Sequence, residues 1–243
     1  MRLDKAAALT VLTRSEAKKA VAAGRVTVNG QIVRDSAAQV DPGDVRVDGR
    51  AAGAGEIYIM LNKPAGVITA TEDRRLPTVM DLLPETMRRR GPGPVGRLDR
   101  DVTGLVLLTT DGQLAHRLTS PRWKAEKTYR ARCGGRLTAE DAAAFARGIA
   151  LSDFTARPAR LEIIEAGEAQ SLADVTLTEG RFHQVKRMFA AAGHPLTALQ
   201  RRRIGTLALD EDLAEGEWRR LTPEEIDGLR AMCSLEERCT EHE

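Results

Sequence analysis

The sequence predicts an α+β protein: a small N-terminal helix-helix-hairpin module precedes a larger domain with a mixed, mainly antiparallel sheet flanked by helices. Short apolar segments, typical of strands, outnumber amphipathic helical segments along most of the chain. The two kinds of segment do not alternate regularly, as they would around a parallel sheet. A run of small residues, Ala51–Gly55, favours a flexible linker between the two parts.

The first fifty residues are expected to form two helices followed by short strands. Helices are predicted over Arg2–Leu12 and Ser15–Ala23, the second with Ser15 as its N-cap and Gly24 after its end. An Asn29-Gly30 pair between apolar residues is a strong hairpin signal. The predicted strands are Arg25–Asn29, Gln31–Arg34 and Val45–Val47.

Residues 56–232 carry the strands and helices of the larger domain. The predicted strands are Ile57–Leu61, Leu105–Thr109, Glu126–Cys133, Leu161–Ile164, Leu172–Leu177, Leu196–Ile204 and Thr206–Leu209. The predicted helices are Pro77–Leu83, Leu114–Leu118, Thr138–Arg147, Phe182–Ala192 and Pro223–Met232. Residues 233–243 form an acidic C-terminal tail, which we expect to be disordered beyond Leu235.

Charge is distributed unevenly, although the net charge is only +2. Six Lys and Arg and no acid lie between Arg181 and Arg203, whereas twelve acids and four bases follow from Gly205 to the end. This asymmetry favours a basic working face that binds nucleic acid, with an ordinary solvated surface as the alternative.

Several classes of protein are not expected from the composition. The three cysteines have no CxxC spacing, and the four histidines have no zinc-like spacing with them, so free thiols and no metal site are predicted. No apolar stretch approaches the ~18 residues of a membrane span, and the N-terminus lacks the apolar region of a signal peptide. We therefore expect a cytoplasmic, monomeric protein with no membrane partner.

One acid, Asp99, lies in a loop that leads into the apolar run Leu105–Thr109, between Arg97 and Arg100. Loop residues held by a rigid sheet commonly carry chemistry. The alternative is that Asp99 caps a turn and pairs with an arginine, because turns often use Asp. The residues alone leave both interpretations open.

Four segments resemble motifs of the RsuA/RluA-type pseudouridine synthases, in the same order along the chain. Gly96-Arg97-Leu98-Asp99 followed by Thr103-Gly104-Leu105 resembles the family signature. The other three segments are Lys63-Pro64-Ala65-Gly66, Lys127-Thr128-Tyr129 and residues 180–187, GRFHQVKR. Residues 14–30, RSEAKKAVAAGRVTVNG, resemble the RNA-binding module shared with small-subunit ribosomal protein uS4. The resemblance implies a uS4-like domain over 1–50 and a catalytic domain over 56–232, with the catalytic cleft across the middle of its sheet.

The resemblance implies three catalytic residues. Asp99 would be the nucleophile, and Tyr129 would stack on the target base. Lys186 would pair with Asp99 and offset its desolvation in the pocket. Asp101 is expected to be structural, because on an extended segment it would point away from Asp99. His183 is left outside catalysis.

Further residues are expected to contact substrate or RNA. Arg97 would hold open the space of the flipped nucleotide, and Arg187 would contact a phosphate. Structural and substrate-contacting roles for Lys63 remain equally open. In the N-terminal module, the cations that match the RNA-binding pattern are Arg14, Lys18, Lys19 and Arg25.

The expected reaction is the isomerisation of uridine to pseudouridine in rRNA. It oxidises nothing and releases nothing, so no cofactor is expected. Residues 179–205 most resemble the members of the RsuA branch that act on the small ribosomal subunit, so 16S rRNA is the expected target. A pseudouridine synthase acting on 23S rRNA and a non-enzymatic RNA-binding ribosome assembly factor are the alternatives.

Overall fold

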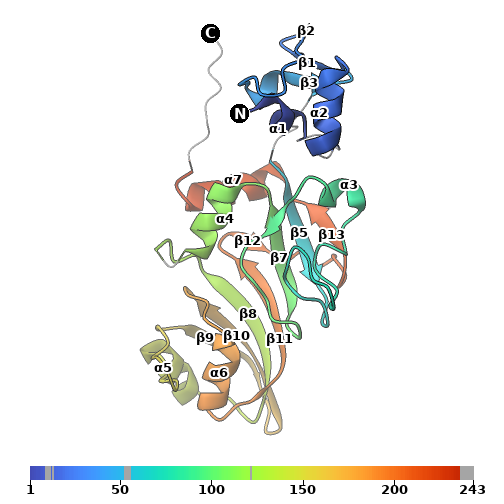
Figure 1. Ribbon diagram of the computed structural model, residues 1–243. Coiled ribbons are helices and arrows are strands. Elements are labelled where there is room, and N and C mark those ends of the chain that lie inside the picture. Colours follow the sequence, from blue (N-terminus) through green and yellow to red (C-terminus); the bar gives the residue numbers. More distant parts are fainter. Residues whose placement is uncertain (9–11, 13, 52–55, 121, 236–243) are drawn as a thin grey trace. The chain divides into compact units, whose positions relative to one another are not determined.

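The computed structural model describes residues 1–8, 12, 14–51, 56–120 and 122–235 (Figure 1). The chain divides into two compact units. One comprises Met1–Ile57 and Leu83–Gly93, and the other comprises Tyr58–Leu82 and the chain from Pro94 onward. The architecture is α+β with a mixed, mostly antiparallel sheet, as the sequence predicted.

The first unit contains helices α1 (Leu3–Ala7), α2 (Arg14–Ala22) and α3 (Glu85–Arg88), and the 3-10 turn η1 (Pro42–Asp44). Its antiparallel sheet has the order β2-β1-β3-β4, formed by β1 (Val26–Val28), β2 (Gln31–Ile32), β3 (Val45–Val47) and β4 (Arg50–Ala51). Asn29 and Gly30 both have positive φ, 50° and 80°, and join β1 to β2, which confirms the predicted hairpin.

Small aliphatic side chains form the core of this unit. Leu3, Ala6 and Ala7 of α1 are fully buried and pack with Ala17 and Val21 of α2. Alanines on the facing sides let the two short helices approach closely. The predicted cap at Ser15 is wrong, because α2 already begins at Arg14. Residues 9–11 of the predicted first helix lie outside the described residues.

The second unit is built on one long, nine-stranded sheet. Seven of its strands have the order β13-β5-β7-β11-β8-β10-β9. Neighbours are antiparallel except β7 and β11, which are parallel at the centre. The bounds are β5 (Tyr58–Lys63), β6 (Gly93–Pro94), β7 (Thr103–Thr109), β8 (Lys127–Gly134), β9 (Arg160–Ala166), β10 (Gln170–Leu177), β11 (Leu196–Ile204), β12 (Leu207–Ala208) and β13 (Trp218–Arg220).

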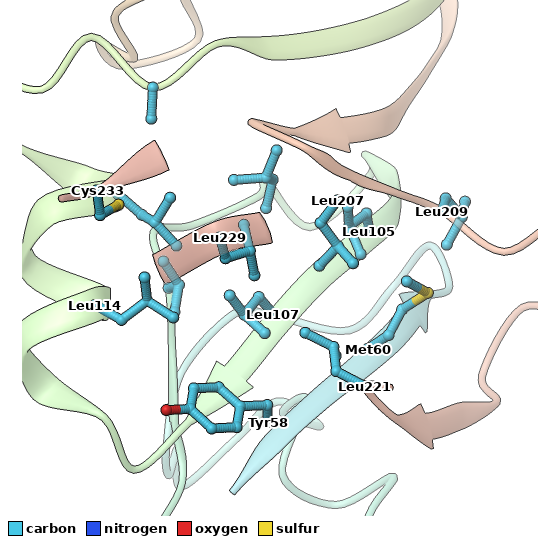
Figure 2. Packing of buried hydrophobic residues seen from close by; sticks show 14 residues of the cluster. Tyr58, Met60, Leu105, Leu107, Leu114, Leu207, Leu209, Leu221, Leu229 and Cys233 are labelled. Carbon is cyan, nitrogen blue, oxygen red and sulfur yellow. The ribbon is translucent and has the colours of Figure 1, made fainter. Parts of the chain in front are cut away.

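Four helices flank this sheet: α4 (Gly112–Thr119), α5 (Ala139–Arg147), α6 (Gln184–Ala191) and α7 (Pro223–Met232). Side chains of Asp111, Thr138 and Thr222 cap α4, α5 and α7. Figure 2 shows Leu114 of α4 and Leu229 of α7 packed with apolar side chains of β5, β7 and β12. At the other end of the sheet, Phe145 of α5 meets Phe189 of α6 edge to face, with ring centroids 5.0 Å apart.

The structure departs from the sequence predictions at several places in the larger unit. Pro77–Leu83 forms turns instead of a helix, because Asp81 accepts hydrogen bonds from the backbone and hydroxyl of Thr78, and Val79 N bonds to Ile68 O. Strand β13 was not predicted. Cys233, placed in the acidic tail by the sequence, is buried with the core, so the packed region runs past residue 232.

Candidate active site

Asp99 lies in a turn that enters β7 at the middle of the sheet. Its carbonyl accepts a hydrogen bond from Val102 N at 3.2 Å, which closes the turn. The side chain is 31% exposed, so its carboxylate is partly shielded from water but open to a ligand.

Lys63 stabilises this turn through hydrogen bonds to the backbone. The residue is fully buried, and burial lowers the pKa of its ammonium to about 8. Its Nζ donates to three backbone carbonyls, those of Pro64, Val67 and Arg100, at 2.8, 2.7 and 3.3 Å. Because Arg100 follows Asp99 directly, these bonds fix the turn that carries the carboxylate. Of the two roles that the sequence left open, the contacts favour the structural one for Lys63.

Lys186, on α6, lies between two carboxylates. Its Nζ is 3.1 Å from Asp99 Oδ2 and 2.7 Å from Asp101 Oδ1. Burial alone would lower the pKa of Lys186, but hydrogen bonds to Asp101 and Asp99 outweigh burial and raise it. The expectation that Asp101 points away from Asp99 is wrong, because residues 99–102 form a turn instead of an extended segment.

His183 also approaches Asp99, which the sequence analysis missed. Its Nε2 lies 3.5 Å from Asp99 Oδ1, and its ring stacks on Phe182 with centroids 3.8 Å apart. The helix begins at Gln184, and His183 has a left-handed backbone, with φ of 50°, at the N-cap position. A non-glycine residue seldom adopts this conformation. No pattern in the sequence marks the turn, so only the structure shows the contact.

Tyr129, on β8, completes the group. It lines a cleft of about 630 Å³ together with Arg97 and Asp99. Tyr129 is 8% exposed, and its hydroxyl makes no hydrogen bond to any described residue. An adjoining hollow is lined by the same three residues and Lys186. The structure therefore brings Arg97, Asp99, Tyr129 and Lys186 to one place.

Arg187 does not join them. Its guanidinium pairs with Asp153 and lies over the ring of Phe154, 5.3 Å from the centroid, outside both hollows. This engagement does not favour the phosphate contact expected from the sequence.

Three of the four expected RNA-binding cations of the first unit lie beside carboxylates. Arg14 and Lys18 lie 3.6 and 4.0 Å from the buried carboxylate of Asp4, and Arg25 pairs with Asp48. Lys19 is exposed on α2. The side chains of Arg14 and Lys18 are 63% and 54% exposed, so both reach solvent despite their pairing.

Within the described part of the chain, no group of three His, Cys, Asp or Glu side chains could hold a metal ion. None of its helices is both long and apolar enough to cross a membrane.

Comparison with known proteins identifies both parts of the chain. Residues 57–191 match the family model described as RNA pseudouridylate synthase, and residues 1–51 match the S4 domain. The protein named Ribosomal small subunit pseudouridine synthase A in Yersinia pestis is 44% identical over 237 residues, covering 95% of this chain and 99% of that protein. Its namesake in Escherichia coli (strain K12) is 46% identical over 233 residues, covering 93% and 98%.

Two further likenesses agree. The Bacillus subtilis protein named Uncharacterized RNA pseudouridine synthase YtzG is 43% identical over 232 residues, covering 93% of this chain and 97% of that protein. A solved crystal structure of a pseudouridylate synthase superposes with a TM-score of 0.67 at 41% identity, covering 94% of this chain and 99% of that one.

Proposed function

Because the chain belongs to the RNA pseudouridylate synthase family, we propose that it isomerises a uridine of small-subunit (16S) rRNA to pseudouridine. The observation that carries the proposal is the placement of Asp99 in a cleft beside Tyr129 and Lys186. The target is supported by 44% and 46% identity, over nearly the whole chain, to relatives named for the small ribosomal subunit.

The reaction needs one ionised carboxylate. The bond from ribose C1′ to uracil N1 breaks, the base turns within the site, and C1′ bonds to C5. The proton displaced from C5 is balanced by one gained at N1, so nothing is oxidised. The opening step, attack on the sugar or removal of a ribose proton, requires a carboxylate in either case. Asp99 supplies it, and the Lys186 ammonium 3.1 Å away stabilises its charge.

The cleft has room for an extruded nucleotide. A stacked uridine hides its glycosidic bond, so the enzyme must flip the base out before reaction. The cleft volume of about 630 Å³ lies within the usual range for a small-molecule site. Tyr129 forms one wall on which the uracil stacks, and the exposed Arg97 occupies the space that the flipped base leaves.

The first unit is proposed to hold the rRNA by its backbone. Arg14, Lys18, Lys19 and Arg25 place cations near α2 and β1, where they would contact phosphates without reading sequence. We expect residues 1–50 to act as this RNA-binding domain, and an rRNA substrate would place the protein in the cytoplasm.

Full-length protein incubated with 16S and 23S rRNA, followed by chemical mapping of pseudouridine, tests the proposal. New pseudouridine at one site of 16S rRNA is the expected result. Modification of 23S rRNA alone would contradict the 16S target. If 16S rRNA, 23S rRNA and partly assembled small subunits all stay unmodified, the proposed activity is wrong.

A further inference from the structure

Arg201 is a buried cation whose guanidinium is only partly used by the protein. The residue is 1% exposed, and its Nε donates to Leu105 O at 2.8 Å. Its Nη2 is buried without a hydrogen-bond partner, and neither terminal nitrogen donates to a described residue. A buried donor left unpaired is costly, and such groups are rare in folded proteins.

The position of Arg201 is fixed by the close pairing of β7 and β11. A Cβ atom on Gly104 would lie 2.3 Å from Arg201 O, so only glycine allows the two strands to approach this closely. Gly104 also has φ of 99°, which side chains rarely adopt. Arg201 is therefore held rigidly by its backbone, directly across from Tyr129 in the β8–β11 pairing.

Lys127 lies on the same side of the sheet. It is two residues before Tyr129 on β8, so both side chains share one face, and residues directly across a strand pair share a face as well. Lys127 and Arg201 both line the cleft that contains Asp99. Burial lowers the pKa of Lys127, and the charge of Arg201 lowers it further.

Neither cation has an acidic partner in the part of the chain that the structure describes. Lys127 Nζ donates to Ala125 O at 3.0 Å, and no described carboxylate lies within ion-pair distance of it or of Arg201. Two like charges shielded from water repel each other unless an anion joins them. In an RNA substrate the anionic group is the backbone phosphate. A uracil carbonyl could accept a hydrogen bond but carries no charge to offset two cations.

We propose that Lys127 and Arg201 form the site for one backbone phosphate flanking the target uridine. The inference rests on the proposed function, since it assumes an RNA strand in the cleft. The phosphate would offset the charge of Arg201 and accept a hydrogen bond from the ammonium of Lys127, the less buried of the two residues. Because Tyr129 pairs directly with Arg201 and is two residues from Lys127 on β8, holding the phosphate here would set the flipped nucleotide against the tyrosine ring.

The test pairs protein variants with RNAs that lack one charge. Short 16S rRNA fragments containing the target uridine carry a neutral methylphosphonate at the phosphate 5′ or 3′ of that uridine. Each neutral RNA is paired with a matched RNA that has the ordinary phosphate at the same linkage. Both RNAs of a pair carry a 2′-O-methyl group next to that linkage, which prevents strand cleavage. Dissociation constants are measured for the wild type, Lys127→Gln and Lys127→Arg.

For one of the two linkages, we expect the neutral RNA to bind wild type about tenfold more weakly, the loss of one charge-assisted contact. Lys127→Gln should bind the charged RNA about tenfold more weakly than wild type does, and replacing the charged RNA by the neutral one should weaken its binding little further. Lys127→Arg should bind nearly as wild type. The proposal would be overturned if, at both linkages, the affinity losses from Lys127→Gln and from the neutral linkage multiplied to about a hundredfold. It would also be overturned if neither neutral RNA bound wild type more weakly than its charged match.

Two controls keep the result specific. Arg136→Gln removes an exposed cation that pairs with Glu168 outside the cleft, and it should leave binding and its dependence on the linkage unchanged. Arg201→Lys keeps the charge but loses the bond to Leu105 O; if it fails to fold, the Lys127 variants still decide. Wild-type activity on unmodified RNA tests the proposed function separately, so failure of the phosphate site can be told apart from failure of the activity.

Discussion

The N-terminal unit and the cleft of the larger unit both build charge clusters, but in opposite proportions. In the first unit, one buried carboxylate, Asp4, is surrounded by three cations: Arg2, Arg14 and Lys18. Beside the cleft, one ammonium, Lys186, lies between two carboxylates, Asp99 and Asp101.

The surplus charge differs in each cluster, and it matches the proposed task. Around Asp4 the surplus is positive and reaches solvent through long, half-exposed side chains, which suits contact with phosphates. Around Lys186 the surplus is negative, because two carboxylates share one ammonium, and one of them, Asp99, lines the cleft where the reaction is proposed to occur. The same ion-pair chemistry thus yields a binding surface in one unit and a reactive group in the other.

The largest effect is expected from Asp99→Asn. The change preserves side-chain volume but removes the charge, so pseudouridine formation should fall by on the order of 10⁴-fold or more, with RNA binding within a few-fold. Single-turnover assays measure the rate of pseudouridine formation, and a binding titration measures the RNA affinity. Asp101→Asn is the matched control two residues away. It should lower the rate of pseudouridine formation less than about tenfold, because Lys186 still pairs with Asp99. Equal losses in both variants would remove the distinction between the two carboxylates.

The next effect concerns Lys186. Lys186→Met leaves Asp99 and Asp101 facing each other without a cation, so the single-turnover rate at saturating enzyme should drop by roughly 10²–10³-fold. RNA affinity should change far less. Lys186→Arg preserves the charge and should retain substantial activity. A normal single-turnover rate for the Met variant would show that the lysine serves binding alone.

A smaller effect is expected from the cations of the first unit. Replacing Arg14, Lys18, Lys19 and Arg25 together by Gln should weaken rRNA binding, and the plot of log affinity against log salt should become shallower by up to about 3. The control is a double variant, Arg136→Gln and Arg160→Gln, which removes two exposed cations of the other unit. If the slope is unchanged in the fourfold variant, these residues do not contact the RNA backbone.

The smallest effect is expected from pH acting on Asp4. Its cations, Arg2 first, lower the pKa of Asp4 below the usual value, so the ionised form stabilises the folded unit above about pH 4 and this contribution is lost as the pH falls further. Hydrogen exchange of the α1 amides, corrected for its intrinsic pH dependence, should show this loss. Asp4→Asn should be less protected at neutral pH and less acid-sensitive, whereas the exposed Asp44→Asn should behave as wild type. Identical acid sensitivity in Asp4→Asn would exclude Asp4 as the cause.

The sequence by itself determined those local elements that have a strong turn or cap signal. Asn29-Gly30 specifies its turn because both residues accept positive φ, and Thr222 with Pro223 marks the start of α7. The motifs also identified the family and singled out Asp99, Tyr129 and Lys186 as a group. Each of these signals is contained in a few consecutive residues, so it can be read without knowing the fold.

Only the tertiary structure decided which charges meet. Asp101 and Lys186 are 85 residues apart, and a turn that no local pattern marked brings them together. The same holds for His183 beside Asp99, and for Arg201, which the sequence showed only as one of several arginines in a basic run. Its burial and unpaired nitrogen follow from the parallel contact of β7 with β11 at Gly104. Strand pairing joins segments distant in the chain, and the environment of a charge depends on what that pairing places around it.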